Sequence, residues 1–217
     1  MTFEEATREA ARAAHGAVTK AMEDVRLGHE VDEDDLTGIL VGRIGSALDG
    51  EIGGLKWKCS ILRHRRGKAA EEKKYGADML MHVTMDTPTQ KYSKGVLVQS
   101  KKVGPDRGMY PSEKSELTEQ CRKMLAVTPA AFVFDYGKGY MRCGPASRIV
   151  GATSHDLYKI CGWTSYRFFL EYFRSPIGDP RITSSFVKDL PPPWELKITA
   201  EGSLDEEGGS PFPFRLR

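Results

Sequence analysis

The stretch from Gly76 to Lys102 limits the fold of this chain more than any other, because it is patterned as two β-strands joined by a polar turn. Residues 78–84 and 96–102 are rich in Met, Val and Leu, which suit strands. The run Asp-Thr-Pro-Thr at 86–89 lies between them, and these residue types are common in turns. The stretch therefore predicts a β-hairpin.

Three polar residues of this hairpin suggest chemistry. Asp78 opens the first strand, and Gln99 and Lys101 are two apart in the second. A period of two places the side chains of Gln99 and Lys101 on one face of the sheet. Carboxylate and amide oxygens suit Mg²⁺, and a lysine beside them can hold a water or a phosphate oxygen. The alternative is a solvated hairpin with an aspartate cap and a lysine-rich edge strand.

At Gly76-Ala77-Asp78 and Gln99-Ser100-Lys101 the chain resembles the PD-(D/E)XK nuclease superfamily, which has the restriction-endonuclease-like fold, and within it the branch with a QxK motif. The resemblance implies a core of α-β-β-β-α-β order and metal-dependent cleavage of DNA phosphodiesters. It also implies that Asp78 is a metal ligand, that Gln99 is a ligand in place of the more usual Glu, and that Lys101 is the catalytic lysine. The implied cofactor is Mg²⁺, for which Mn²⁺ can substitute.

A third ligand is expected on the helix before the sheet, where the family commonly places an extra acid. Leucines and isoleucines recur every three or four residues after Asp32, which predicts an amphipathic helix. Glu33 is the acid nearest the buried face, and Asp34 and Glu51 are its rivals. Acids at a helix N-terminus also have a purely structural explanation, because they cap the helix and interact favourably with its dipole.

The charge distribution suits a polyanionic substrate. Residues 1–50 carry five Lys/Arg against eleven Asp/Glu, a balance of −6, and residues 51–102 carry twelve against five, a balance of +7. Phosphate neutralisation supplies most non-specific affinity for nucleic acid. We therefore expect DNA as the partner, with RNA not excluded, and contacts from Arg63, Arg65, Arg66 and Lys102. The alternative is that these basic side chains are only solvated surface.

The order of expected elements agrees with the implied core. A long helix over 2–27 and the helix from about 32 precede a strand at 55–61 and the hairpin. A helix over 112–127 and a second hairpin over 130–144 follow. This order predicts an α/β fold, a mixed central sheet flanked by helices, with the core at about 32–145.

Three parts of the chain are expected from this order. They are an N-terminal helix (1–30), a nuclease-like domain (31–190) whose residues 146–190 form a helical extension, and a C-terminal tail (191–217) rich in Gly, Ser and acids. Small residues form a stripe on the first helix, which suits packing on a helix of this chain or of a second copy. A homo-oligomer and a larger multidomain assembly both stay open.

Composition bounds the remaining classes. The 217 residues are 40% apolar and 29% charged, which is typical of a soluble protein, and no apolar run is long enough for a membrane span. Four cysteines without a CxxC pair predict reduced thiols in the cytoplasm and argue against structural zinc. There is no P-loop, GxSxG or HExxH motif, so nucleotide hydrolysis and zinc-protease chemistry have no support.

Two functions follow from these patterns. The first is a Mg²⁺-dependent endodeoxyribonuclease, which would suit the effector domain of a phage-defence or mobile-element system. The second is a module of the same fold that binds nucleic acid or protein without cutting.

Overall fold

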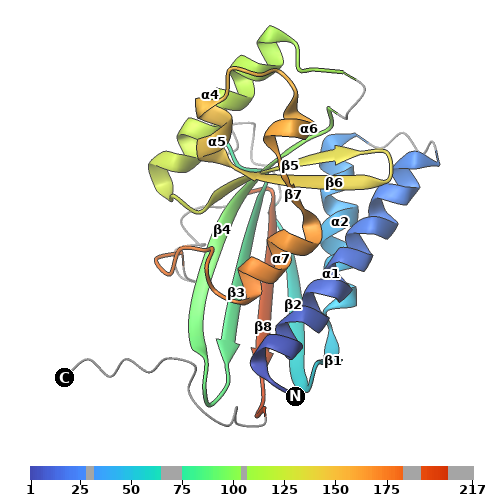
Figure 1. Ribbon diagram of the computed structural model, residues 1–217, viewed down its shortest axis with the longest axis vertical. Coiled ribbons are helices and arrows are strands. Elements are labelled where there is room, and N and C mark those ends of the chain that lie inside the picture. Colours follow the sequence, from blue (N-terminus) through green and yellow to red (C-terminus); the bar gives the residue numbers. More distant parts are fainter. Residues whose placement is uncertain (28–31, 65–74, 104–106, 183–191, 205–217) are drawn as a thin grey trace.

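The computed structural model describes residues 1–27, 32–64, 75–103, 107–182 and 192–204. These residues form an eight-stranded sheet with helices on both faces (Figure 1). The strand order is β1-β2-β8-β3-β4-β5-β6-β7, in which β3 is parallel to β8, β4 is parallel to β5, and the other neighbours are antiparallel. The predicted α/β fold with a mixed sheet flanked by helices is therefore confirmed.

The strands differ greatly in length, and the two shortest, β1 and β7, lie at the edges of the sheet. Their bounds are β1 (Gly50–Ile52), β2 (Leu55–Arg63), β3 (Met79–Asp86), β4 (Lys91–Lys101), β5 (Ala131–Gly137), β6 (Tyr140–Pro145), β7 (Trp163–Thr164) and β8 (Trp194–Glu201).

The predicted hairpin is present as β3 and β4. Its register runs from Met79 opposite Val98 to Asp86 opposite Lys91, and the turn is closed by a hydrogen bond from Thr87 N to the Gln90 carbonyl at 3.0 Å. Side chains alternate along β3 as the sequence predicted, so that its two faces pack into two different hydrophobic clusters.

The expected C-terminal tail is wrong for Trp194–Glu201, because this segment is β8 and lies between β2 and β3. It pairs antiparallel with β2 and parallel with β3, so both of its edges are hydrogen-bonded. Leu196, Ile198 and Ala200 alternate along it and are buried. Burial of this apolar row stabilises the strand at the centre of the sheet. The expected first strand, β2, is consequently separated from the hairpin by β8.

Helices cover both faces of the sheet (Figure 1). One face carries α1 (Phe3–Arg26), α2 (Glu33–Ala47) and α7 (Ser165–Phe173), and the other carries α4 (Pro111–Val127), α5 (Ala146–Gly151) and α6 (Leu157–Ile160). The small-residue stripe of α1 is buried within this chain, where α1 packs against α2 and α7. Thr2 and Glu5 cap α1 reciprocally, as Thr2 N donates to Glu5 Oε2 at 2.9 Å and Glu5 N donates to Thr2 Oγ1 at 3.2 Å.

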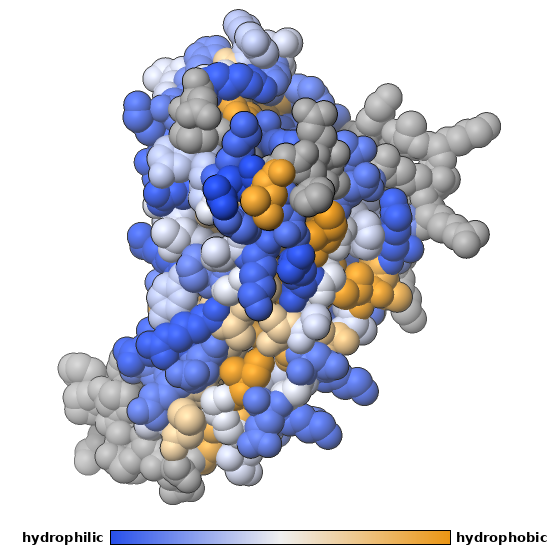
Figure 2. All heavy atoms as spheres, turned by 90° about the vertical axis from the view of Figure 1, so that its right-hand side faces the viewer, coloured by the Kyte–Doolittle hydropathy of each residue, from blue (hydrophilic) through white to orange (hydrophobic). Residues whose placement is uncertain are grey.

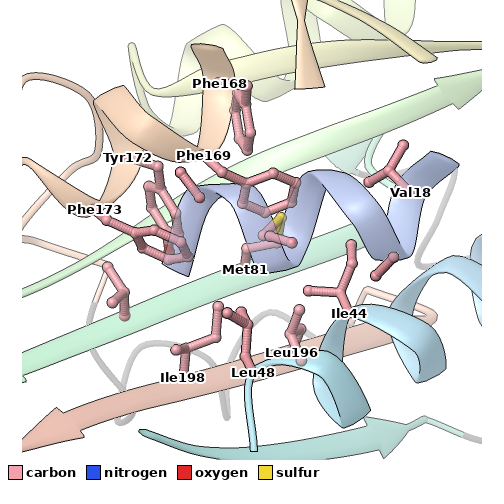
Figure 3. Close-up of a cluster of buried hydrophobic side chains, with 14 of the residues drawn as sticks. Val18, Ile44, Leu48, Met81, Phe168, Phe169, Tyr172, Phe173, Leu196 and Ile198 are labelled. Atoms are coloured by element: carbon pink, nitrogen blue, oxygen red, sulfur yellow. The ribbon is translucent and has the colours of Figure 1, made fainter. Parts of the chain in front are cut away.

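Aromatic residues of α7 form the centre of the larger core (Figure 3). The Phe168 ring lies edge-on to Phe132 and Phe134 of β5, with centroids 5.2 and 4.9 Å apart. The Phe173 ring lies 5.1 Å from that of Trp57 on β2. These pairs attach α7 to strands on both sides of the hairpin.

The outer surface of α1 and α2 is mainly hydrophilic, with separate apolar groups between the polar ones (Figure 2). In the described part of the chain, no helix combines the length and the apolar character that crossing a bilayer requires. All four cysteines are free thiols.

Lys94 is an unusual member of the larger core. It points from β4 toward α7, its side chain is buried, and its Nζ donates to the Ile177 carbonyl at 2.5 Å. Its ammonium lies 5.0 Å from the ring centre of Tyr92 and 5.3 Å from that of Tyr172. Burial lowers the pKa of Lys94 from 10.5 to about 7.

Lys94 is expected to add a positive contribution to the free energy of unfolding as the pH is raised from about 7 toward 10.5. In this window the unfolded chain keeps the Lys94 proton and the folded chain releases it, so the slope from this group is positive, at most about 1.4 kcal/mol per pH unit. Lys94→Met should remove this part of the slope, and Lys91→Met, on the exposed end of β4, should not. Urea unfolding at a series of pH values measures the slopes, and equal slopes for the two variants would contradict the assignment.

Candidate active site

The three hairpin residues meet at one end of the sheet. Here β4 and β5 end and β3 and β8 begin (Figure 1). Asp78 is the residue immediately before β3. Gln99 and Lys101 are the last two residues of β4 whose side chains are on the sheet face covered by α4 and α5. The expectation that Gln99 and Lys101 share a face is confirmed.

Asp78 is held firmly between two strands. Its amide donates to the Val98 carbonyl at 2.9 Å, and its carbonyl accepts from Trp194 N at 3.1 Å. Its carboxylate is nearly buried, and Oδ2 accepts from Gln99 Nε2 at 2.7 Å and from Ser100 N at 2.8 Å. The structure therefore places the Asp78 carboxylate in direct contact with the Gln99 amide.

The backbone before Asp78 requires a glycine. Gly76 has a φ of +69°, and a Cβ at this position would lie 2.4 Å from the carbonyl oxygen of Gln120 on α4. The close approach of Gly76 to α4 fixes where the chain enters β3, and with it the direction of the Asp78 side chain.

Gln99 has one satisfied and one unsatisfied end. Its Nε2 donates to Asp78 and, at 3.1 Å, to the Ser100 carbonyl. Its Oε1 is buried and has no hydrogen-bond partner among the described residues. A buried acceptor left without a partner costs about 1–3 kcal/mol, so such an atom calls for an explanation.

Lys101 is paired with the acid of the preceding helix. Its Nζ lies 3.5 Å from Glu33 Oε1, and Lys102 N donates to Glu33 Oε2 at 3.1 Å. Burial raises the pKa of Glu33, and the charge of Lys101 acts against this rise. The structure therefore brings Glu33 to the end of β4, as expected, with its carboxylate held by Lys101 and by the backbone of Lys102.

Of the two rivals of Glu33, Asp34 pairs with a basic residue at this same end of the sheet, whereas Glu51 lies at the far end. The Asp34 carboxylate is 3.8 Å from the Arg63 guanidinium. Glu51 on β1 is opposite Lys56 on β2 in the sheet register, and Lys56 is opposite Glu201 on β8. Glu201 is at the end of β8 that is far from Asp78. The sheet register therefore excludes Glu51 from this end of the sheet.

A buried hydroxyl network fixes α2 against the sheet. Thr37 Oγ1 donates to the Glu33 carbonyl at 2.8 Å and lies 3.2 Å from Ser100 Oγ. The Tyr136 hydroxyl of β5 lies 2.9 Å from Ser100 Oγ, and burial raises the pKa of this tyrosine, which keeps it protonated. The network positions Glu33 relative to β4. Sequence reasoning missed it, because its members come from three distant segments.

Two further buried acids were also missed. Asp135 on β5 is directly opposite Lys101, and its Oδ1 accepts from Val103 N at 3.2 Å. Glu195 on β8 lies 3.3 Å from His64 Nε2 and 3.1 Å from Lys197 Nζ. An acid inside the apolar run at 131–136 was a signal for Asp135, whereas Glu195 lay in the segment expected to be a tail.

The basic residues predicted to contact nucleic acid are only partly within the described chain. Arg63 lies at the same end of the sheet as Asp78, where its guanidinium stacks 4.9 Å from the Trp194 ring centre. The Lys102 side chain is exposed beside the Glu33 pair. Arg65 and Arg66 fall outside the described residues.

The donors present suit a hard cation only in part. Asp78, Gln99 and Glu33 supply carboxylate and amide oxygens, the ligand type that Mg²⁺ prefers. Within the described residues, however, no group of three or more His, Cys, Asp or Glu side chains could hold a metal ion. The possible metal ligands that are not held by a lysine are therefore the Asp78 carboxylate and the unsatisfied Gln99 Oε1.

A scan against protein-family models and searches of curated proteins and of solved structures find no match to this chain.

Proposed function

We propose that this chain is a metal-dependent nuclease that hydrolyses phosphodiester bonds of DNA. The observation that carries the proposal is the unsatisfied Gln99 Oε1, a buried oxygen of the amide whose Nε2 contacts the Asp78 carboxylate, two positions before Lys101 in β4. A cation held by this oxygen and by the Asp78 carboxylate would satisfy the atom.

The architecture supports the restriction-endonuclease-like part of the proposal. Apart from the short strand β1 between α2 and β2, the elements α2, β2, β3, β4, α4 and β5 follow each other in the order α-β-β-β-α-β. The crossover through α4 makes β5 parallel to β4 and places Asp135 opposite Lys101. The insertion of β8 between β2 and β3 departs from a simple three-strand meander, so the match is one of order and not of every neighbour.

Asp78 and Gln99 would hold Mg²⁺ or Mn²⁺, with Glu33 as a further ligand if it leaves Lys101. A bound cation supplies charge to polarise the scissile phosphate and lowers the pKa of a coordinated water. The amide ligand leaves the site one negative charge weaker than a carboxylate would, so we expect weak metal binding.

The remaining residues would act on the phosphate and on the water. Lys101 is only 18% exposed, so its charge is incompletely screened by solvent, and it would orient the water or stabilise negative charge in the transition state. Without substrate, the Lys101 ammonium is paired with Glu33, with its Nζ 3.5 Å from Glu33 Oε1. The Thr37–Ser100–Tyr136 network would keep α2 and β4 in fixed positions while Lys101 moves from Glu33 to the phosphate.

DNA is the proposed substrate because the charge balance of residues 51–102 is positive and Arg63 lies at the same end of the sheet as the site. An effector role in a phage-defence or mobile-element system is part of the same proposal.

One observation favours the second candidate, a module that binds without cutting. Glu33 is already engaged by Lys101 and by Lys102 N, and no cluster of three metal-ligating side chains occurs in the described ranges. In such a module the Lys101–Glu33 pair would be permanent and would simply attach α2 to β4.

Binding of Mn²⁺, followed by electron paramagnetic resonance, tests the metal site. Wild-type protein should bind the ion saturably, and Asp78→Asn should weaken binding by about tenfold or more, because it removes the carboxylate charge but keeps an oxygen for Gln99 and Ser100. The matched control is Asp86→Asn, at the other end of β3, where the side chain is exposed. Equal binding by the two variants would show that Asp78 is not a ligand.

A further inference from the structure

A cavity of about 200 Å³ opens at the edge of the sheet beside β6. It lies between the second half of α1, the β6 strand, α6 and the beginning of α7. On its outer edge β6 is paired with β7 only at Arg142 and Cys143. Within the described chain, the outer edge of its first residues is therefore not covered by a strand. We call this cavity the edge pocket, defined by His15, Tyr140, Arg142, Tyr158 and Ser165.

The lining of the edge pocket suits a phosphate ester. Arg142 is its cation: one terminal nitrogen donates to the Tyr158 hydroxyl at 2.8 Å and the guanidinium stacks 4.7 Å from that ring centre. His15 Nδ1 lies 2.7 Å from Ser165 Oγ, which orients the imidazole. Of the described residues that line the pocket, none is acidic. The remaining guanidinium N–H groups can donate to an anion in the pocket, and the acid directly opposite Arg142 on β5, Asp135, accepts from Val103 N.

The aromatic part of the lining suits a flat ring. Tyr140 and Tyr158 meet edge to face with centroids 5.1 Å apart. Tyrosine faces next to an arginine are a common platform for nucleobases, because every base can stack on them. Phosphate and base together are the recognition elements of a nucleotide.

The pocket lies on a line of residues that begins at the candidate active site. Arg142 is directly opposite Asp135, and Asp135 is directly opposite Lys101. Two strand spacings of about 4.8 Å place the β6 backbone on the order of 10 Å from that of β4. This separation is short enough for nearby nucleotides of one strand to reach both places.

We propose that the edge pocket binds one nucleotide of the DNA strand whose phosphodiester lies at Lys101, with the phosphate on Arg142 and the base against Tyr140 and Tyr158. This rests on the proposed nuclease function, and it adds a subsite that holds an unpaired nucleotide close to the cut. The base must be unpaired, because a base stacked on these tyrosines cannot remain in a duplex.

Calorimetric titration in EDTA tests the subsite without any cleavage. The probes are deoxyadenosine 5′-monophosphate, deoxyadenosine, inorganic phosphate and a single-stranded hexadeoxynucleotide. We expect the mononucleotide to bind better than deoxyadenosine or phosphate, and the hexanucleotide to bind better still, since it also reaches Lys101. Arg142→Gln should weaken binding of both nucleotide probes by about tenfold or more, the usual effect of losing a charge-assisted hydrogen bond.

The chain offers a matched control in Arg167→Gln. The Arg167 guanidinium also stacks 4.7 Å from an aromatic ring, that of Trp163, but Arg167 does not line the pocket. If Arg142→Gln folds poorly, His15→Gln, on an exposed position of α1, provides a second variant with the same expected direction.

Equal losses for Arg142→Gln and Arg167→Gln, or no binding of any nucleotide, would overturn the proposal. Binding of the mononucleotide with no gain for the hexanucleotide would overturn the strand subsite in favour of a site for free nucleotides. The nuclease function fails separately: an intact subsite with no metal-dependent cleavage contradicts only that function.

Discussion

Replacing Lys101 with methionine is expected to lower the rate of DNA cleavage by about 100- to 1,000-fold, the usual effect of losing one group that stabilises transition-state charge. Methionine keeps an apolar stem of similar length, so the packing at the end of β4 should persist. The loss of the ammonium also removes the partner of Glu33, whose pKa is already raised by burial, and this acid should then take up a proton more readily.

The measurement for Lys101→Met is conversion of supercoiled plasmid to nicked and linear forms, with thermal unfolding by circular dichroism to establish folding. Lys91→Met is the matched control, because Lys91 is 71% exposed at the opposite end of the same strand. The control should cut at the wild-type rate. A Lys101→Met protein that cuts as fast as the control would show that the catalytic lysine has been misassigned.

Ile198→Ala is expected to reduce the free energy of unfolding by about 2–5 kcal/mol, which is typical for truncating a fully buried isoleucine. Ile198 lies at the middle of β8, where it contributes to the larger core with Leu196 and with aromatic residues of α7 (Figure 3). The truncation removes apolar contact and leaves a cavity between strands that cannot easily move together, because both edges of β8 are paired.

Urea unfolding measures this effect, and Thr199→Ala provides the control one residue away. Thr199 is exposed, so its truncation should change stability by no more than about 0.5 kcal/mol. If Ile198→Ala were as stable as Thr199→Ala, β8 would not be a central strand and residues 194–201 would behave as the tail that composition predicted.

The β8 strand shows where sequence reasoning failed. Its alternation of apolar and polar side chains is as clear as that of β2, but three prolines before it and the Gly, Ser and acid-rich stretch after it favoured a tail. Nothing local indicates that a strand from the end of the chain inserts between β2 and β3, because pairing partners are set by long-range packing.

The site itself was predictable to the extent that it depends on local periodicity. Asp78, Gln99 and Lys101 lie on one hairpin, so a period of two was enough to bring them together. The resemblance to the nuclease family suggested an acid on the helix before the sheet, and helix periodicity favoured Glu33 over its rivals Asp34 and Glu51. Asp135 was not predictable, because its place opposite Lys101 depends on the register of β5 against β4.

The most direct test of the central claim is plasmid cleavage by wild-type protein with Mg²⁺, with Mn²⁺ and with excess EDTA, repeated on single-stranded DNA and on RNA. The proposed nuclease should nick or linearise plasmid with either metal and should stop in EDTA, because the Asp78–Gln99 pair needs a cation to act on the phosphate. An intact plasmid in every metal condition, with the protein folded and bound to the DNA, would contradict the nuclease and would support the module that binds without cutting.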